Sequence, residues 1–340
     1  MPGINDVAAL AKVSTGTVSR ALNGKGHVSE ATRLRVLSAA EQLGYVVSSN
    51  ASGLATGRTK NVGVVVPFLN RWFFSSVIEG AEGALLAHGY DLTLYNLVGG
   101  SDERRSVFEH FLPRKRVDAV IAVCLELTST ELGHLLDLGK PIVGVGGPLQ
   151  GLRTLSIDDV AMARTATEHL LLLGHRRIAH IGGTSALELD FHLPASRREG
   201  YEAALRSAGL AADPALYAAA DFTVPGGYRA AQTLLADARA RPTAIFAASD
   251  EMAIGAILAA RDLGLAVPGG LSVIGIDDHE LSAFFGLSTI AQFPEEQGRR
   301  AVEFLMDELH PAGLLPAADH PLRFELVVRT STAAPGRREL

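Results

Sequence analysis

A cluster of small, hydroxyl-bearing and cationic residues lies within six positions near the N-terminus: Thr15, Gly16, Thr17, Ser19 and Arg20. Short side chains and a guanidinium can reach base edges and phosphates when they share one face of a helix in the DNA major groove. Arg20 could donate two hydrogen bonds to a guanine, or contact a phosphate without reading any base. The cluster predicts a DNA-reading surface, and both roles of Arg20 stay open.

Two short helices joined by a tight turn are needed to position this cluster. The apolar residues of the first form one stripe: Ile4, Val7, Ala8 and Leu10. The second begins at Ser14, whose hydroxyl can cap the helix, and it buries Val18, Ala21 and Leu22. A third helix, over residues 30–44, has as its apolar positions Thr32, Leu34, Val36, Leu37, Ala40 and Leu43. An ordinary surface hairpin is the alternative, because amphipathic helix pairs are common.

The charge of the chain is divided unevenly. Residues 1–60 hold seven Lys or Arg against three Asp or Glu, a net charge of +4. The whole chain has 31 basic and 37 acidic residues, a net charge of -6, which leaves -10 on residues 61–340. A basic head on an acidic body is typical of a phosphate-binding module fused to a sensing domain.

Length and composition indicate a folded protein of two or three domains, because the 340 residues are 47% hydrophobic. We find neither an N-terminal signal pattern nor a run of the ~20 apolar residues that would cross a bilayer, which predicts a cytoplasmic protein. Cys124, the single cysteine, cannot form an internal disulfide. Its apolar surroundings predict a buried, inert thiol.

From residue 61 onward, short apolar runs alternate with longer amphipathic segments. The runs predict strands over residues 62–66, 91–95, 119–123, 142–145, 178–181, 244–247, 272–276 and 323–328. Helices are predicted over residues 75–88, 103–111, 163–173, 196–208, 227–236, 250–263 and 295–309. This α/β alternation indicates parallel sheets covered by helices, with too many strands for one small sheet. Two lobes are therefore expected, with a ligand cleft at the carboxyl ends of their strands.

Motifs for the common enzyme chemistries are incomplete. The glycines of residues 144–147 and 182–183 complete no dinucleotide-binding pattern, and the sequence contains neither a phosphate-binding loop nor a serine elbow. The eleven histidines form no metal-binding pattern. Asp277 and Asp278 could form an acid/base pair, but neighbouring strand residues point to opposite faces, which favours one hydrogen-bonding and one structural carboxylate. No catalytic residue, metal or cofactor is predicted.

Taken in order along the chain, these segments resemble the LacI/GalR family of ligand-responsive transcription regulators. The headpiece match includes Val13-Ser-Thr-Gly-Thr-Val-Ser-Arg20 and parts of residues 28–45. The sensor match includes residues 61–67, 168–183, 197–201 and 249–255, and Ser272-Val-Ile-Gly-Ile-Asp-Asp278. The resemblance runs from Ile4 to about Thr332, and so many matches in the same order are highly specific.

The resemblance implies a helix-turn-helix DNA-binding headpiece over residues 1–46, a hinge or linker over 47–60, and a periplasmic-binding-protein-like sensor with parallel sheets. The N-lobe of the sensor would comprise residues 61–158 and 293–319. Its C-lobe would comprise residues 159–292 and 320–332, and residues 333–340 would form a tail. The resemblance also implies a homodimeric repressor that binds double-stranded, near-palindromic operator DNA and responds to a small effector.

On DNA, the resemblance implies base contacts for Thr15, Gly16 and Arg20. Thr17 and Ser19 would lie near phosphates, and Asn23 would also belong to the DNA-binding surface. In this family a hinge leucine is wedged into the central base step and kinks the duplex, and Leu54 occupies the matching position. A contact of Leu54 with the sensor is the alternative.

For the effector, the resemblance implies contacts by Trp72, Phe73, Phe74, Arg197, Phe222, Ser249, Asp277 and Gln292. The aromatic rings would stack on a sugar ring or on a flat base, although core packing is an alternative for Phe74. Arg197 and Asp277 would grip vicinal hydroxyls as a forked donor and a fixed acceptor. A sugar or sugar derivative is expected, and a purine-like ring is the second choice.

The sequence departs from the family pattern in the hinge and in the cleft. Val47 and Ser52 replace a usual proline and a frequent arginine, and Asn50 and Gly53 have low helix propensity. The hinge helix is therefore expected to form weakly or only on DNA. Gly146 stands where an acid is common, and Arg71 adds a cation beside the aromatic residues. Both changes favour an anionic effector such as a sugar phosphate or sugar acid, unless Arg71 is simply solvated.

Two other classes of protein share parts of this pattern. A solute-binding protein would have the same two-lobed body, but it would need export and would lack the basic headpiece. A sugar-modifying enzyme would need a general acid, a general base or a nucleophile in the cleft. Assays of turnover on candidate sugars distinguish an enzyme from a regulator.

Overall fold

The computed structural model describes residues 2–23, 27–45, 58–97, 101–114, 116–184, 193–310 and 318–336. It divides into two compact units, which we describe separately: residues 1–60 with 115–118, and residues 61–114 with 119–340. Leu54, Val47 and Ser52 lie outside the described residues, as does the side chain of Asn23. The roles proposed for them therefore stay predictions.

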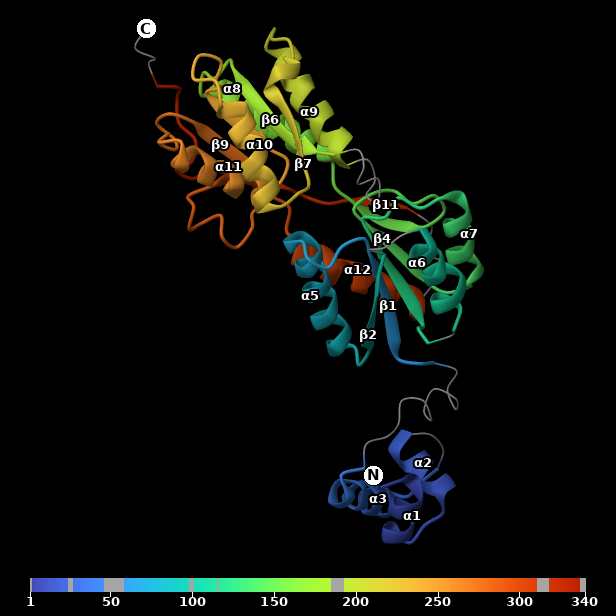
Figure 1. The fold of residues 1–340 in the computed structure, drawn as a ribbon. Coiled ribbons are helices and arrows are strands. Elements are labelled where there is room, and N and C mark those ends of the chain that lie inside the picture. Colours follow the sequence, from blue (N-terminus) through green and yellow to red (C-terminus); the bar gives the residue numbers. More distant parts are fainter. Residues whose placement is uncertain are drawn as a thin grey trace. The chain divides into compact units, whose positions relative to one another are not determined.

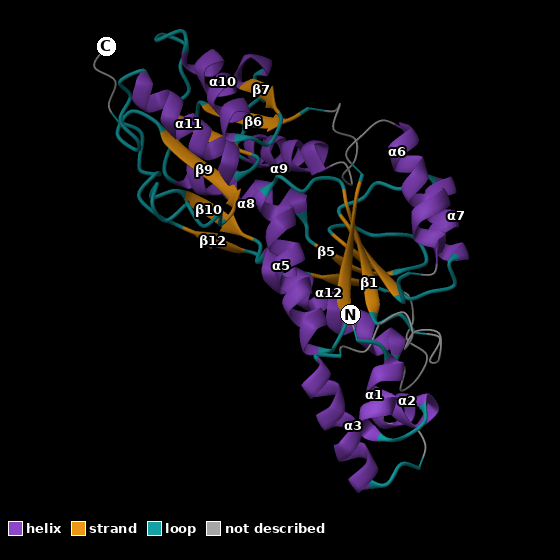
Figure 2. Ribbon diagram, turned by 60° about the horizontal axis from the view of Figure 1, so that its bottom comes forward, coloured by secondary structure: helices purple, strands orange, loops and turns teal. Residues whose placement is uncertain are grey.

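The described residues of the first unit form three helices, α1 (Ile4–Ala11), α2 (Thr15–Asn23) and α3 (Glu30–Leu43), labelled in Figures 1 and 2. Ser14 caps α2 as predicted, because its Oγ accepts a hydrogen bond from the Thr17 backbone N–H over 3.2 Å. Gly44 follows α3 in the left-handed conformation, with φ of 60°. The core consists of small and β-branched residues: Val7, Ala8, Ala11, Val18, Ala21, Val36, Ala39 and Ala40.

Three leucines predicted for the apolar faces of these helices are exposed instead. The exposed fraction is 47% for Leu10, 59% for Leu34 and 43% for Leu37. Alanines fill much of the core, so the helices approach closely and the leucines at the flanks of each stripe stay in solvent.

The second unit contains two sheets, each with six strands among the described residues. The first sheet is parallel throughout, in the order β11 (Asp319–Pro321), β5 (Arg153–Ser156), β4 (Ile142–Val145), β3 (Ala119–Val123), β1 (Asn61–Val66) and β2 (Asp91–Asn96). The second has the order β12 (Glu325–Val327), β10 (Ser288–Ala291), β9 (Ser272–Asp277), β8 (Ala244–Ala247), β6 (Ile178–Gly183) and β7 (Tyr217–Ala220). In the second sheet the β10–β12 pair is antiparallel and the other pairs are parallel.

Helices cover both faces of each sheet (Figure 1). In the first sheet α5 (Trp72–Ala87) and α12 (Pro294–Leu309) pack together, opposite α6 (Ser101–Ser106) and α7 (Ser129–Asp137). In the second sheet α8 (Asp159–Leu172) pairs with α9 (Leu193–Ser207), and α10 (Val224–Leu235) pairs with α11 (Asp250–Asp262). The helix predicted over residues 103–111 is divided, because a π-helical turn (Val107–Phe111) follows α6. None of the described helices is long and apolar enough to cross a membrane.

The chain passes between the two sheets after β5, after β10 and after β11, which defines an N-lobe around the first sheet and a C-lobe around the second. The lobe boundary predicted between residues 319 and 320 falls inside β11, which pairs with β5 over its whole length. The connections that follow the carboxyl ends of the parallel strands are where a ligand site is expected in such sheets.

Glycines allow the paired helices to touch through their backbones. A Cβ atom on Gly80 of α5 would lie 2.0 Å from the Glu295 carbonyl oxygen of α12, and one on Gly298 would lie 2.0 Å from the Val77 oxygen. Gly227 of α10 is similarly close to Met252 of α11. Helices therefore cross at glycines in both lobes.

We expect Gly80→Ala to destabilise the second unit by about 1–3 kcal/mol, because the added methyl group cannot fit without separating α5 from α12. Gly83 is the matched control on the same helix, since a Cβ atom there meets nothing within 4 Å. Gly83→Ala should stabilise by roughly 0.5–1 kcal/mol through helix propensity. Urea unfolding followed by circular dichroism measures both, and equal effects of the two variants would contradict the close crossing.

Candidate DNA-binding and effector sites

The predicted DNA-reading residues share one helix, α2. Thr15, Gly16 and Arg20 are exposed, whereas Thr17 and Ser19 are half-buried. Arg20 Nη2 donates a weak hydrogen bond to the Thr17 hydroxyl over 3.4 Å. Residues three apart lie on the same face of a helix, so this contact keeps the Arg20 guanidinium beside Thr17.

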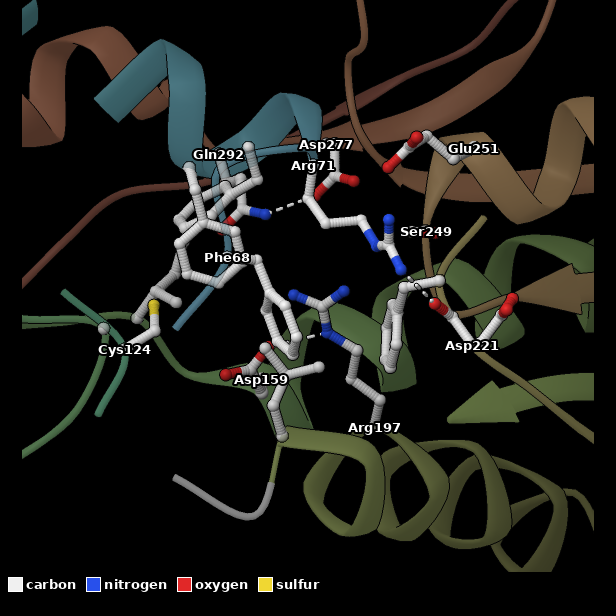
Figure 3. Close-up of a pocket in the computed structure, with 16 residues that line it drawn as sticks. Phe68, Arg71, Cys124, Asp159, Arg197, Asp221, Ser249, Glu251, Asp277 and Gln292 are labelled. Atoms are coloured by element: carbon white, nitrogen blue, oxygen red, sulfur yellow. Dashed lines mark hydrogen bonds and ion pairs between the residues drawn. The ribbon is translucent and has the colours of Figure 1, made fainter. Parts of the chain in front are cut away.

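A cavity lies between the two lobes at the carboxyl ends of their strands (Figure 3). The N-lobe contributes Phe68, Arg71, Phe73, Phe74, Cys124 and Gly146. The C-lobe contributes Asp159, Leu193, Arg197, Asp221, Phe222, Ser249, Glu251 and Asp277, and the crossovers contribute Ile157 and Gln292. Seven of the eight predicted effector residues are therefore brought together here.

The exception is Trp72, which borders a neighbouring hollow instead of this cavity. Phe68 takes a place in the aromatic wall, with its ring edge-on to that of Phe74 at a centroid distance of 5.8 Å. Sequence reasoning missed Phe68, Asp221 and Glu251. Their positions in the sequence could have indicated them. Phe68 closely follows the strand β1, and Asp221 and Glu251 lie within two residues of the predicted effector residues Phe222 and Ser249.

Backbone strain marks the same edge of the sheets. Cys124, Phe222 and Asp277 have positive φ angles of 46°, 56° and 130°. Each lies at or just after the carboxyl end of a strand, namely β3, β7 and β9. Such conformations cost of order 1–3 kcal/mol each and concentrate at functional sites.

Arg197 projects its guanidinium from α9 into the cavity (Figure 3). Its Nε donates to Asp159 Oδ1 over 2.8 Å, and its Nη1 donates to the Ala248 carbonyl oxygen. The side chain is only 3% exposed, so this is a buried ion pair. Burial raises the pKa of Asp159, and the Arg197 guanidinium opposes that rise. The two anchors fix the plane of the donor fork.

Asp277 and Gln292 extend from neighbouring strands and are bonded to each other, because Gln292 Nε2 donates to Asp277 Oδ1 over 2.5 Å. Burial raises the pKa of Asp277 to about 8, although Arg197 lowers it. A carboxyl that is protonated at neutral pH can both donate and accept a hydrogen bond. Asp278 instead pairs with Arg329 Nη2 at 2.6 Å, so the two carboxylates have separate roles, as the strand alternation predicts.

Arg71 is bonded across the cavity rather than solvated. Its Nη2 donates to the Asp221 carbonyl oxygen over 3.2 Å, and Figure 3 shows the side chain extended toward the C-lobe. Burial raises the pKa of nearby Glu251, while Arg71 and a hydrogen bond from the Trp72 backbone lower it. The lining holds four acidic residues and only two arginines. The cavity therefore does not carry the positive charge that Arg71 alone suggests.

Cys124 explains why a glycine stands at position 146. A Cβ atom on Gly146 would lie 2.3 Å from the Cys124 sulfur, and the glycine has a φ of 102°. The thiol thus occupies the space into which an acidic side chain would extend. Cys124 is buried as predicted, at 5% exposed, and it also lines the cavity.

The cavity is small as it stands. About 60 Å³ of it is open to the centre of a water molecule, room for roughly four waters. A ligand of sugar size therefore enters only if the lobes separate or if side chains such as Arg71 move. Among the described residues, no group of His, Cys, Asp and Glu has the arrangement of a metal site.

A headpiece with an accessible cationic helix, joined to a two-lobed body with a polar cavity, is the organisation of a ligand-responsive DNA-binding regulator. Residues 3–48 match the family described as bacterial regulatory proteins, lacI family, and residues 167–332 match a periplasmic binding protein-like domain. The chain belongs to the LacI family. It is a transcriptional regulator and not an enzyme.

Relatives support this assignment over the whole chain. The HTH-type transcriptional repressor CytR of Escherichia coli K12 is 36% identical over 336 residues, which cover 97% of this chain and 96% of the relative. The lac repressor dimer bound to operator and the anti-inducer ONPF has a TM-score of 0.84 at 26% identity, covering 98% and 99% of the two chains. A transcriptional regulator CelR–cellobiose complex has a TM-score of 0.71 at 32% identity, covering 97% and 100%.

Proposed function

We propose that this chain is a homodimeric cytoplasmic repressor that binds a near-palindromic operator and responds to a sugar or sugar derivative. The observation that carries the proposal is the presence of both Arg197 and Asp277 in the lining of one cavity between the lobes, beside several aromatic rings. A forked donor and a carboxyl in the same cavity, beside flat apolar rings, suit a ring that bears hydroxyl groups. The solved relatives that hold operator DNA and cellobiose support both halves of the proposal.

Charge in the cavity favours a neutral effector over an anionic one. Asp159, Asp221 and Glu251 line it beside Asp277, whose carboxyl is protonated at neutral pH. Arg197 pairs with Asp159, whereas Arg71 donates to the backbone carbonyl oxygen of Asp221. An anion would approach these carboxyl groups in a site of low dielectric, which is unfavourable. The sugar phosphate or sugar acid suggested by Arg71 and Gly146 is therefore the second candidate, and a purine-like ring that stacks on Phe222 is the third.

The proposal is tested in two steps with the full chain. Genomic fragments retained by the purified protein are sequenced to give the operator, and a near-palindrome bound by two protomers is expected. Calorimetric titration then compares neutral sugars, their phosphates, their acids and purine nucleosides. Tightest binding by an acid or phosphate would overturn the neutral assignment, and turnover of any of these compounds would contradict a pure binding role.

Arg20→Ala is expected to lower the preference for operator over random DNA by about 1–3 kcal/mol, because a bidentate contact to guanine is lost. Arg20→Lys separates the two roles that the sequence leaves open, since it keeps the charge and loses the fork. Fluorescence anisotropy at several salt concentrations gives the binding constants. Full recovery of specificity in the lysine variant would show that Arg20 contacts only phosphate.

The wedge role of Leu54 rests on its position in the hinge sequence, since that residue lies outside the described ranges. Insertion of an apolar side chain unstacks a base step and bends the duplex. Bending of the selected operator by the wild-type protein, measured with circularly permuted fragments, is the relevant observation. A straight complex would remove the wedge from the mechanism.

A further inference from the structure

Trp72, the only tryptophan of the chain, contacts the opposite lobe. Its ring packs on the His279 ring with a centroid distance of 4.8 Å and an interplanar angle of 34°. Trp72 begins α5 in the N-lobe, and His279 follows β9 in the C-lobe. The aromatic contact therefore joins the two lobes directly, outside the cavity lining.

The backbone of Trp72 makes a second contact between the lobes. The first N–H groups of a helix have no partner within the helix, and Arg71, which precedes α5, supplies no side-chain cap. The Glu251 carboxyl of α11 lies near the Trp72 backbone N–H, which lowers the pKa of that carboxyl against the effect of burial. A carboxyl of the C-lobe thus lies at the N-terminus of an N-lobe helix, where the helix dipole favours a negative charge.

Arg71 adds a third contact, through the hydrogen bond from Nη2 to the Asp221 carbonyl oxygen. Two consecutive residues of the N-lobe therefore reach three separate connections of the C-lobe. These connections follow β7, begin α11 and follow β9. All three contacts come from two consecutive residues at the start of one helix. They must therefore form together when the lobes approach and break together when the lobes separate.

The C-lobe side of these contacts is held rigidly. The His279 backbone N–H donates to Asp250 Oδ2 over 2.9 Å, and this buried carboxylate also accepts hydrogen bonds from Ser282 and Thr289. The Leu281 N–H donates to His279 Nδ1 over 3.0 Å, so the ring presents a fixed, neutral tautomer. Burial lowers the pKa of His279, which also favours the neutral ring.

We propose that Arg71 and Trp72 form an interlobe latch, which holds the N-lobe and the C-lobe together before any effector binds. Trp72 is then a positioning residue that sets lobe closure, and it is not a ligand of the effector. The latch keeps the two lobes close over a cavity with room for only a few water molecules. The latch must open for the effector to enter the cavity. If the effector then binds the closed state, re-formation of the latch adds to its affinity.

The latch itself is measurable without DNA or effector, because the fluorescence of the single tryptophan reports on it. We expect the ligand-free wild type to show an indole that is shielded from acrylamide. Glu251→Ala leaves the indole itself unchanged, yet it removes the carboxyl beside the Trp72 backbone N–H. The ratio of latched to open molecules should fall by about two- to fivefold, because a negative charge at the N-terminus of α5 is lost.

The quenching constant of Trp72 should then rise and its emission should shift to the red, and the radius of gyration from X-ray scattering should increase. Arg71→Ala should do the same by an independent contact, which guards against a folding defect at Glu251. Glu82→Ala is the matched control, an exposed carboxylate on α5 that should leave all three readings unchanged.

An indole as accessible in the wild type as in both latch variants would overturn the proposal. The effect on the operator rests on the proposed function and is measured separately, as the change in operator affinity of Glu251→Ala without effector. Loss of DNA binding by every protein, wild type included, would refute the proposed function and leave the fluorescence result standing.

Discussion

Replacing Arg197 with alanine is expected to leave operator binding intact and to weaken effector binding by about 5- to 150-fold, the effect of ~1–3 kcal/mol. The guanidinium is anchored by Asp159 and by the Ala248 carbonyl oxygen, so its donors have a fixed direction in the cavity. An effector oxygen buried there would lose its partner. The headpiece folds around a separate core, which is why DNA binding should persist.

Arg198→Ala is the control for this prediction. Arg198 is next to Arg197 on α9, but it pairs with Glu202 at 2.8 Å and lies outside the cavity. Removing Arg197 also leaves the Asp159 carboxyl buried without its cation, so circular dichroism must show a folded protein. Titration of the selected operator and sugar gives the comparison. A response to effector that survives in Arg197→Ala would place the ligand elsewhere.

Acidification is expected to destabilise the second unit by about 3 kcal/mol through His180 alone. This ring is fully buried on β6 and stacks on Phe246 with centroids 4.8 Å apart. Its Nδ1 lies 3.0 Å from the Phe246 carbonyl oxygen, while its Nε2 is buried without a hydrogen-bond partner among the described residues. Burial lowers the pKa of His180 to about 4. The imidazole is therefore neutral in the folded protein.

The unfolded chain binds a proton at His180 near pH 6.5, whereas the folded chain does so only near pH 4. Stability through His180 is fully present above the higher value and is lost as the pH falls between the two. His169 and His175 act in the same direction, because burial lowers their pKa values as well. Buried acids with raised pKa values act oppositely, so only a comparison of variants isolates one residue.

His180→Phe keeps an aromatic ring against Phe246 and removes the titrating group. We expect the variant to be less stable than the wild type at pH 7, because the Phe246 oxygen loses a donor, and to lose less further stability at pH 4.5. Urea unfolding at the two pH values measures both differences. Equal losses in the two proteins would mean that water reaches the buried ring.

The sequence by itself determined the class of fold, because its signals are local. Continuous apolar runs such as residues 119–123 report strands buried on both faces, and Ser14 and Gly44 report where helices begin and end. Short strands such as β7 and β10 were not predicted. Tyr217–Ala220 and Ser288–Ala291 carry little apolar periodicity, and they become strands by pairing with buried neighbours far away in the chain.

The tertiary structure alone decided what several cavity residues do. The sequence grouped Trp72 with Phe73 and Phe74, but a helix start points successive side chains in different directions, and only the packing of the two lobes brings Trp72 onto His279. Gly146 signalled a missing acid, while the structure shows that the Cys124 thiol takes its place. Residue types and spacing identify which side chains can donate or accept hydrogen bonds. The partner of each side chain depends on which distant segments the fold brings together, and a local sequence pattern does not contain that information.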